Sequence, residues 1–195
     1  RRRLAARAYA HTACYDSLIS QYLQQQFAPE TPYPPQIGIG LDIIQTCRYG
    51  ENPHQHAAFY RTGNSKEPSV ANAIQLSGKE LSFNNIYDIN AAFETVKEFA
   101  GSENDMPAAV IVKHTNPCGA ALSPTLAGAF LAAREGDPIS AFGGILAVNC
   151  TLDTATAEEI TGKNTFFEAI IAPDFEVDAI EILTTRKKWG ANLRL

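Results

Sequence analysis

The sequence lacks the features that define several large classes of protein. No stretch of its 195 residues has the roughly 18 consecutive apolar positions that a membrane-spanning helix needs. Basic residues do not outnumber acidic ones: 16 Lys and Arg stand against 21 Asp and Glu, a formal net charge of -5. A dedicated nucleic-acid binder would normally carry a basic face. We therefore expect neither an integral membrane protein nor a nucleic-acid-binding protein.

Cysteine is scarce and irregularly spaced. The four cysteines are Cys14, Cys47, Cys118 and Cys150, and no CxxC pair occurs among them. A disulfide framework or a structural zinc site would show shorter, more regular spacing. We expect four free thiols and a cytoplasmic location, because the cytosol keeps thiols reduced.

The beginning of the chain has neither an initiating methionine nor a signal peptide. Residues 1–26 contain no continuous apolar stretch and no small-residue cleavage site. Tyr15, Leu18 and Tyr22 instead recur at helical spacing, which predicts an amphipathic helix. Because the chain begins inside this helix, we expect it to be a piece of a longer protein, with residues 1–26 belonging to a preceding domain.

A proline-rich segment separates this helix from the remaining residues. Residues 27–40 contain four prolines and two glycines, which disfavour helix and predict a linker before a domain at 41–195. In that domain, continuous apolar runs predict buried strands at 108–114, 143–149 and 166–173. Helical spacing predicts helices at 88–100, 124–136, 152–162 and 174–188. The alternation predicts an α/β fold, a three-layer αβα sandwich with a largely parallel or mixed sheet.

The most informative segment runs from Val112 to Gly119. Lys113 and His114 end a predicted strand, and a turn leading into a helix is expected after them. Ligands often bind at the carboxyl ends of strands in α/β sheets. There, histidine can move protons near neutral pH, and lysine can stabilise a developing anion. The alternative is a core histidine beside a surface lysine, since neighbouring strand residues point to opposite faces.

Residues 47–60 form a second polar segment, rich in planar donors and acceptors. Arg48, followed by Tyr49, suits recognition of a phosphate or a polar heterocycle, because a guanidinium group can bind phosphate through paired hydrogen bonds. A polar loop that caps neighbouring elements would explain the same composition. His54 and His56 could ligate a metal, but no third ligand follows at suitable spacing, so we expect no metal site.

Two further segments offer groups for recognition. Phe142 can stack on a ring, and Gly143 allows positive φ and close approach of the backbone to a ligand, although a tight turn would need the glycine equally. Asn84 and Asn85 are expected just before a helix, where asparagine is a common cap. Asp88 competes for the cap, which leaves at least one asparagine for binding.

One fragment of a zinc-deaminase pattern is present. Pro117 and Cys118 follow a predicted strand, as in PCxxC, but Gly-Ala-Ala follows Cys118 and the second cysteine is missing. The H-x-E half of the pattern is also missing. We therefore expect no zinc.

Taken together, these segments resemble the bifunctional purine-biosynthesis family that joins AICAR transformylase to IMP cyclohydrolase. The matching segments are RYGENPHQ (48–55), GKELSFNNIYD (78–88), VKHTNPCG (112–119), SAFGG (140–144) and EAIIAP (168–173). LAARAYAHTACYD (4–16) resembles the end of the cyclohydrolase domain. Small departures from the family pattern occur at Cys47 and Asp174.

The resemblance implies a domain organisation and an activity. It assigns residues 1–26 to the tail of the cyclohydrolase domain, 27–40 to a linker and 41–195 to the first transformylase subdomain. That subdomain is expected to be cytidine-deaminase-like and zinc-free. The implied enzyme is a phosphoribosylaminoimidazolecarboxamide formyltransferase that transfers the formyl group of 10-formyltetrahydrofolate to the 5-amino group of AICAR. IMP ring closure would take place in the other domain.

The resemblance also implies roles for individual residues. His114 would be the general base, and Lys113 would supply charge in the transition state. The residues expected to bind the nucleotide are Arg48, Tyr49, Asn85, Phe142, Gly143 and Glu168. Active sites completed across a homodimer are implied, with folate contacts and any potassium ion mainly outside this chain, so we do not expect the chain to catalyse alone. The alternatives are a non-catalytic nucleotide-binding or dimerisation module and a relative of the zinc deaminases.

Overall fold

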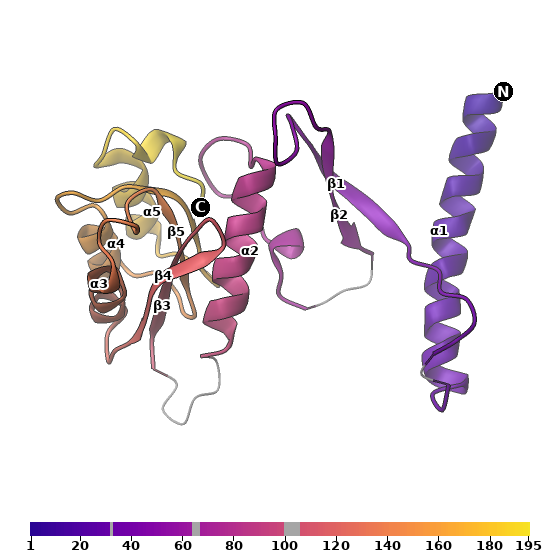
Figure 1. Cartoon of the computed structure of the whole chain (residues 1–195), viewed down its shortest axis with the longest axis horizontal. Coiled ribbons are helices and arrows are strands. Elements are labelled where there is room, and N and C mark those ends of the chain that lie inside the picture. Colours follow the sequence, from indigo (N-terminus) through magenta and orange to yellow (C-terminus); the bar gives the residue numbers. More distant parts are fainter. Residues whose placement is uncertain (32, 64–66, 100–105) are drawn as a thin grey trace. The chain divides into compact units, whose positions relative to one another are not determined.

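The computed structural model describes residues 1–31, 33–63, 67–99 and 106–195 (Figure 1). The chain divides into two compact units. The first comprises Arg1–Thr46 and Ala57–Asn72, and the second comprises Cys47–His56 and Ala73–Leu195. Among the helices in these described ranges, none is long and apolar enough to cross a membrane.

The first unit is built from one long helix and a pair of strands. Helix α1 (Arg2–Phe27) confirms the predicted helix to within one residue, and it buries none of its side chains. Strand β1 (Leu41–Cys47) pairs with β2 (Ala57–Thr62) in a two-stranded sheet, and a short 3₁₀ helix follows at Val70–Asn72. The predicted polar loop at 47–60 is therefore wrong for residues 57–60, which belong to β2. Pairing with β1 satisfies the backbone groups of β2.

The proline-rich segment is held against α1 by side-chain amides. Gln21 Nε2 donates to Gly38 O at 2.6 Å, and Gln24 Nε2 donates to Ala28 O at 2.9 Å. Pro32 of this segment lies outside the described residues. These hydrogen bonds supply donors where proline has removed them from the backbone.

The second unit contains a four-stranded mixed sheet of order β4-β3-β5-β6. Its strands are β3 (Ala108–Lys113), β4 (Asn116–Leu122), β5 (Gly144–Val148) and β6 (Phe167–Ile171). Strand β3 runs antiparallel to both β4 and β5, whereas β5 and β6 are parallel. The predicted strands β3, β5 and β6 are confirmed, and so are the α/β class and the mixed sheet.

Strand β4 corrects the expectation of a turn and then a helix after His114. The turn contains only His114 and Thr115, so residues 116–122 return alongside β3. Small residues dominate this strand, and they carry little strand propensity. Gly119 is required there because a Cβ would collide with the carbonyl oxygen of Ala133 in α3 (Leu126–Gly136).

Helices cover both faces of this sheet. Figure 1 shows α2 (Phe83–Lys97) on one side, with α3 and α4 (Thr154–Ile160) on the other; α5 (Val177–Thr185) packs against α4, and a 3₁₀ turn follows at Gly190–Asn192. Side chains of β3 alternate between the layers. Ala109 and Ile111 join the core cluster that contains Phe130 of α3. Val110 and Val112 point the opposite way and are equally buried.

The helix boundaries differ from the predicted ones because of their caps. Helix α2 begins at Phe83 rather than 88, since Ser82 is its N-cap; the predicted end at residue 100 lies outside the described residues. Thr125 and Asp153 cap α3 and α4 through hydrogen bonds to Gly128 N and Thr156 N. Helices α3 and α4 therefore begin at residues 126 and 154 rather than at the predicted 124 and 152. A capping residue lies outside the helix that it begins.

The strand directions determine which segments meet at each end of the sheet. Val112 pairs with Ile145, and Gly144 pairs with Phe167. The carboxyl end of β3 therefore lies beside the amino ends of β5 and β6. Of the strands that meet here, only β3 presents its carboxyl end, because an antiparallel neighbour presents its opposite end.

Candidate functional site

Most of the predicted site residues meet at this end of the sheet. We call them the sheet-end cluster: Asn85, Lys113, His114, Phe142, Gly143 and Glu168. Lys113 Nζ donates to Phe142 O at 2.8 Å, across 29 positions of sequence. Asn85 Nδ2 donates to Glu168 Oε2 at 3.1 Å. The fold thus joins four separate sequence segments into one polar surface.

His114 lies in a turn with an unusual backbone. Its φ is 51° and that of Thr115 is 61°, both in the left-handed region. Hairpin turns of two residues favour this geometry but normally use Asn-Gly to reach it. For a non-glycine residue such a conformation costs of order 1–3 kcal/mol and is often found at functional sites. His114 is exposed, which is contrary to the alternative of a core histidine.

Three hydrogen bonds hold this turn. Thr115 Oγ1 and Asn116 Nδ2 both donate to His114 O at 2.7 Å. Thr115 N donates to Asp88 Oδ1 at 2.9 Å, from a turn of the chain to the helix α2. The carbonyl of His114 is therefore held by two donors, while the residue itself is exposed.

Phe142 and Gly143 form the neighbouring part of the cluster. Gly143 has φ of 77°, a conformation that glycine allows, and its N–H donates to Phe166 O at 2.8 Å. The Phe142 ring is 52% exposed. Its centroid lies 5.5 Å from that of Phe166, which in turn lies 5.9 Å from Trp189. The exposed ring is thus backed by a row of aromatic side chains.

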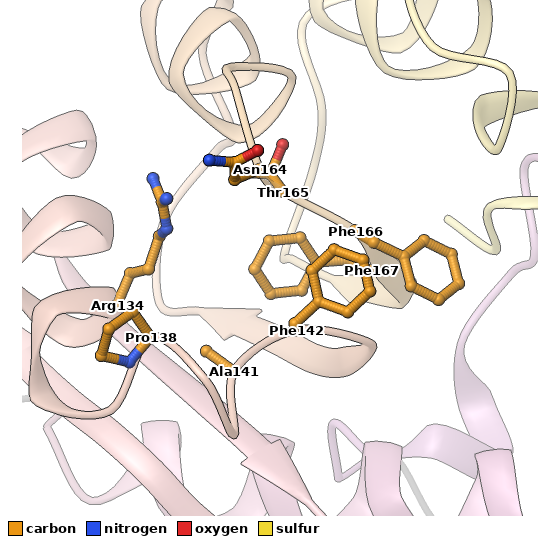
Figure 2. Close-up of a pocket in the computed structure, with 8 residues that line it drawn as sticks. All are labelled: Arg134, Pro138, Ala141, Phe142, Asn164, Thr165, Phe166 and Phe167. Carbon is orange, nitrogen blue, oxygen red and sulfur yellow. The ribbon is translucent and has the colours of Figure 1, made fainter.

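Figure 2 shows the small cavity behind Phe142, where the rings of Phe142, Phe166 and Phe167 gather. Arg134 and Asn164 lie on the side away from these rings. The cavity volume of about 10 Å³ is room for a single water molecule. A ligand ring would therefore have to stack on the outer face of Phe142.

Asn85 has two tasks at the start of α2. Its backbone N–H donates to Ser82 Oγ at 3.2 Å, and its Oδ1 accepts from Ser82 N at 3.2 Å, which completes a capping box. The prediction that Asn84, Asn85 or Asp88 caps the helix is wrong, because Ser82 does so. With its Oδ1 used by the cap, Asn85 offers Nδ2 to Glu168, while Asn84 is exposed.

Arg194 is a member of this site that sequence reasoning missed. Its Nη1 lies 3.7 Å from Glu168 Oε2 and donates to Glu168 O at 3.2 Å. Residues 193–195 run beside β6, where Ile170 N donates to Arg194 O at 2.8 Å. No local sequence signal marks a contact across 26 positions. Asn85 and Arg194 together stabilise the carboxylate of Glu168.

Arg48 and Tyr49 lie in the loop Cys47–His56 of the same unit. The Arg48 guanidinium is 5.9 Å from the centre of the Tyr49 ring. The side chain of Gln55 organises the loop by accepting from Asn52 N at 2.8 Å. Within the described residues, no hydrogen bond or ion pair joins Arg48 or Tyr49 to the sheet-end cluster.

The thiols and the metal-ligating residue types form no further site within the described ranges. All four cysteines are free. Burial, with the negative charge of Asp137 adding to it, raises the pKa of Cys118 beside the turn, so this thiol is protonated at neutral pH and is a poor nucleophile. Burial likewise raises the pKa of Cys47 and Cys150. Across the described part of the chain, no group of three or more His, Cys, Asp or Glu side chains could hold a metal ion.

Comparison with known proteins identifies the family. The family model of the AICARFT/IMPCHase bienzyme matches residues 1–195. The chain therefore belongs to this family, which agrees with the resemblance in its motifs.

Its curated relatives include several bacterial proteins named "Bifunctional purine biosynthesis protein PurH". The relative from Oceanobacillus iheyensis is 48% identical over 195 residues, with 100% of this chain and 36% of the relative covered. The relatives from Lysinibacillus sphaericus and Agrobacterium fabrum are 50% and 51% identical, with 100% of this chain and 35% and 34% of the relatives covered. The chain spans about a third of the length of these relatives.

Proposed function

We propose that this chain is part of a bifunctional enzyme of purine biosynthesis and contributes the acid–base residues of AICAR formyl transfer. The observation that carries the proposal is the exposed His114 in a left-handed turn, adjacent to Lys113, in a chain that matches the family over its whole length. Residues held in unfavourable backbone conformations cluster at active sites.

The reaction explains why these residue types are needed. The 5-amino group of AICAR is a weak nucleophile, because its lone pair delocalises into the imidazole and the carboxamide. Its nitrogen forms a bond to the formyl carbon of 10-formyltetrahydrofolate, and the bond from that carbon to N10 of the folate breaks. His114 accepts the amine proton during attack, and Lys113 stabilises charge on the formyl oxygen or the departing nitrogen. N10 takes up a proton as it leaves, so tetrahydrofolate is the second product.

The remaining predicted residues would bind the nucleotide. Arg48 suits the phosphate, with Tyr49 beside it, and the outer face of Phe142 suits the heterocycle. Gly143 lets the backbone approach the ligand closely. Asn85 and Glu168 offer a hydrogen-bonded amide and carboxylate for polar groups of the base or the ribose.

The wider assignments belong to the same proposal. Residues 1–26 would be the tail of the cyclohydrolase domain, 27–40 a linker and 41–195 a zinc-free, cytidine-deaminase-like first subdomain. The helix-covered mixed sheet supports this fold. A cytoplasmic homodimer would complete the active site, with folate contacts and any potassium ion mainly outside this chain.

The decisive test is His114→Ala in a protein extended to the length of the relatives. Formyl transfer should fall by about 10²–10⁴-fold, the usual effect of removing a general base. IMP ring closure and the melting temperature should hardly change. His56→Ala, an exposed histidine of the same unit, is the matched control. Parallel loss of both activities with a lowered melting temperature would contradict the catalytic assignment.

A non-catalytic nucleotide-binding or dimerisation module is the second candidate. The observation that favours it is that Lys113 Nζ already donates to Phe142 O at 2.8 Å, so this ammonium group is engaged by the backbone. Formyl transfer measured in this chain and in the extended protein separates the two. Nucleotide binding without transfer in both would support the module.

A further inference from the structure

The turn that carries His114 cannot be explained by its own residues. Neither His114 nor Thr115 is glycine, yet both adopt positive φ. Thr115 is β-branched, the class of side chain that tolerates this region least. The pairing of β3 with β4 favours such a turn, and a contact from another element would offset the strain that His114 and Thr115 add.

The outside contact comes from Asp88. Its Oδ1 accepts from Thr115 N at 2.9 Å across 27 positions of sequence. The other two hydrogen bonds of the turn involve only residues of the turn and of β4. A carboxylate that accepts from a backbone N–H makes a charge-assisted hydrogen bond, stronger than one between neutral groups.

Asp88 is itself on a well-anchored element. In the next turns of α2, Ile89 and Ala92 are buried against the sheet, and one turn earlier Asn85 closes the capping box and binds Glu168. Asp88 is half-buried and lies inside the helix rather than at its cap. Helix α2 thus couples both halves of the sheet-end cluster, through Asn85 to Glu168 and through Asp88 to the turn.

We infer that Asp88 is a positioning residue for formyl transfer. It holds Thr115 N–H, keeps the His114–Thr115 turn in its left-handed conformation and so fixes the direction in which the imidazole is presented. Asp88 acts through the backbone and touches no reacting atom. The catalytic part of this inference rests on the proposed function.

The test uses the full chain for structure and the extended protein for activity. Asp88→Ala should speed hydrogen exchange of the Thr115 amide on the order of tenfold or more, the equivalent of one charge-assisted hydrogen bond. It should lower kcat for formyl transfer by a similar factor, with KM for the nucleotide within about twofold, because binding residues are untouched. Asp88→Asn keeps an oxygen acceptor, so both values should fall between wild type and Asp88→Ala.

Thr115→Gly probes the same idea from the turn. Glycine adopts positive φ without strain, so adding Thr115→Gly to Asp88→Ala should restore part of kcat. Glu94→Ala is the matched control: Glu94 is an exposed acid of α2 whose partner is Lys97. It should leave amide exchange and kcat at wild-type values.

The outcomes separate this inference from the proposed function. The role of Asp88 would be overturned if the Thr115 amide exchanged at the wild-type rate in Asp88→Ala. It would also be overturned if that amide lost its protection from exchange while kcat stayed unchanged. Normal formyl transfer in His114→Ala would overturn the proposed function and the catalytic part of this inference together. Amide exchange would still measure whether Asp88 holds the turn. If Asp88→Ala does not fold, wild-type values of both quantities in Asp88→Asn would overturn the inference.

Discussion

Strand β3 contains two regions of opposite character. Its middle, from Ala108 to Val112, is completely buried, and its side chains pack against α2 on one face and α3 on the other. Two residues beyond, His114 is exposed and holds a strained backbone through polar contacts. The middle of the strand contributes to stability, and its end presents the residues that we propose to act in formyl transfer. A site supported in this way rests on a rigid element of the fold.

The comparison predicts that damage to the buried layer affects folding most. Phe130→Ala removes a fully buried ring that lies 5.8 Å from the ring of Phe167, and it should lower the free energy of unfolding by about 3–5 kcal/mol. Urea denaturation followed by circular dichroism measures the change. Leu4→Ala, at an exposed position of α1, should stay within about 0.5 kcal/mol. An equal decrease in the free energy of unfolding in the two variants would contradict the expectation that the buried layer contributes more to stability than the surface.

A smaller effect is expected on binding when Arg48 of the loop Cys47–His56 is changed. Arg48→Ala should weaken binding of the AICAR nucleotide by about 1.5–3 kcal/mol, because a charge-assisted hydrogen bond to phosphate is lost. Isothermal titration calorimetry gives the affinity. Arg61→Ala, an exposed arginine in β2, is the control. Unchanged affinity in Arg48→Ala, with measurable binding to the wild type, would exclude Arg48 from the site.

The smallest effect is expected at Ser82, the N-cap of helix α2, whose partner Asn85 also binds Glu168. Ser82→Ala removes the hydroxyl that accepts from Asn85 N, and a lost N-cap costs about 1 kcal/mol. The same change should weaken the contact between Asn85 and Glu168, visible as faster exchange of the Asn85 side-chain amide in NMR spectra. Ser77→Ala, in the segment before the helix, should change neither quantity. Undiminished stability together with an unchanged Asn85 signal would show that the cap does not support the site.

The buried parts of the fold could be predicted from sequence because their signals are local. AAVIV and GILAV are continuous apolar runs, and a strand buried on both faces has no other pattern. Strand β4 gave no such signal, since it is made of small residues and is joined by a His-Thr turn rather than Asn-Gly. Helix α2 was predicted to begin too late because apolar spacing starts after the cap that Ser82 provides.

The site was predictable only as separate motifs. Lys113, His114 and Phe142 stand out by residue type and by position at strand ends. Their assembly was not predictable from spacing, because it depends on β3 running antiparallel to β5. Asp88 and Arg194 act on partners 27 and 26 positions away, so neither contact leaves a local pattern. Such contacts exist only once the sheet is formed.

The aromatic row behind Phe142 ends at the chain's single tryptophan. Trp189 packs against the core and touches the site through Phe166 alone among the described aromatic contacts. All tryptophan emission therefore originates a short distance beneath the surface on which a ligand ring would stack. We expect a ring stacked on Phe142 to alter that emission, so occupancy of the surface would be measured in this chain without attaching a dye or altering a side chain.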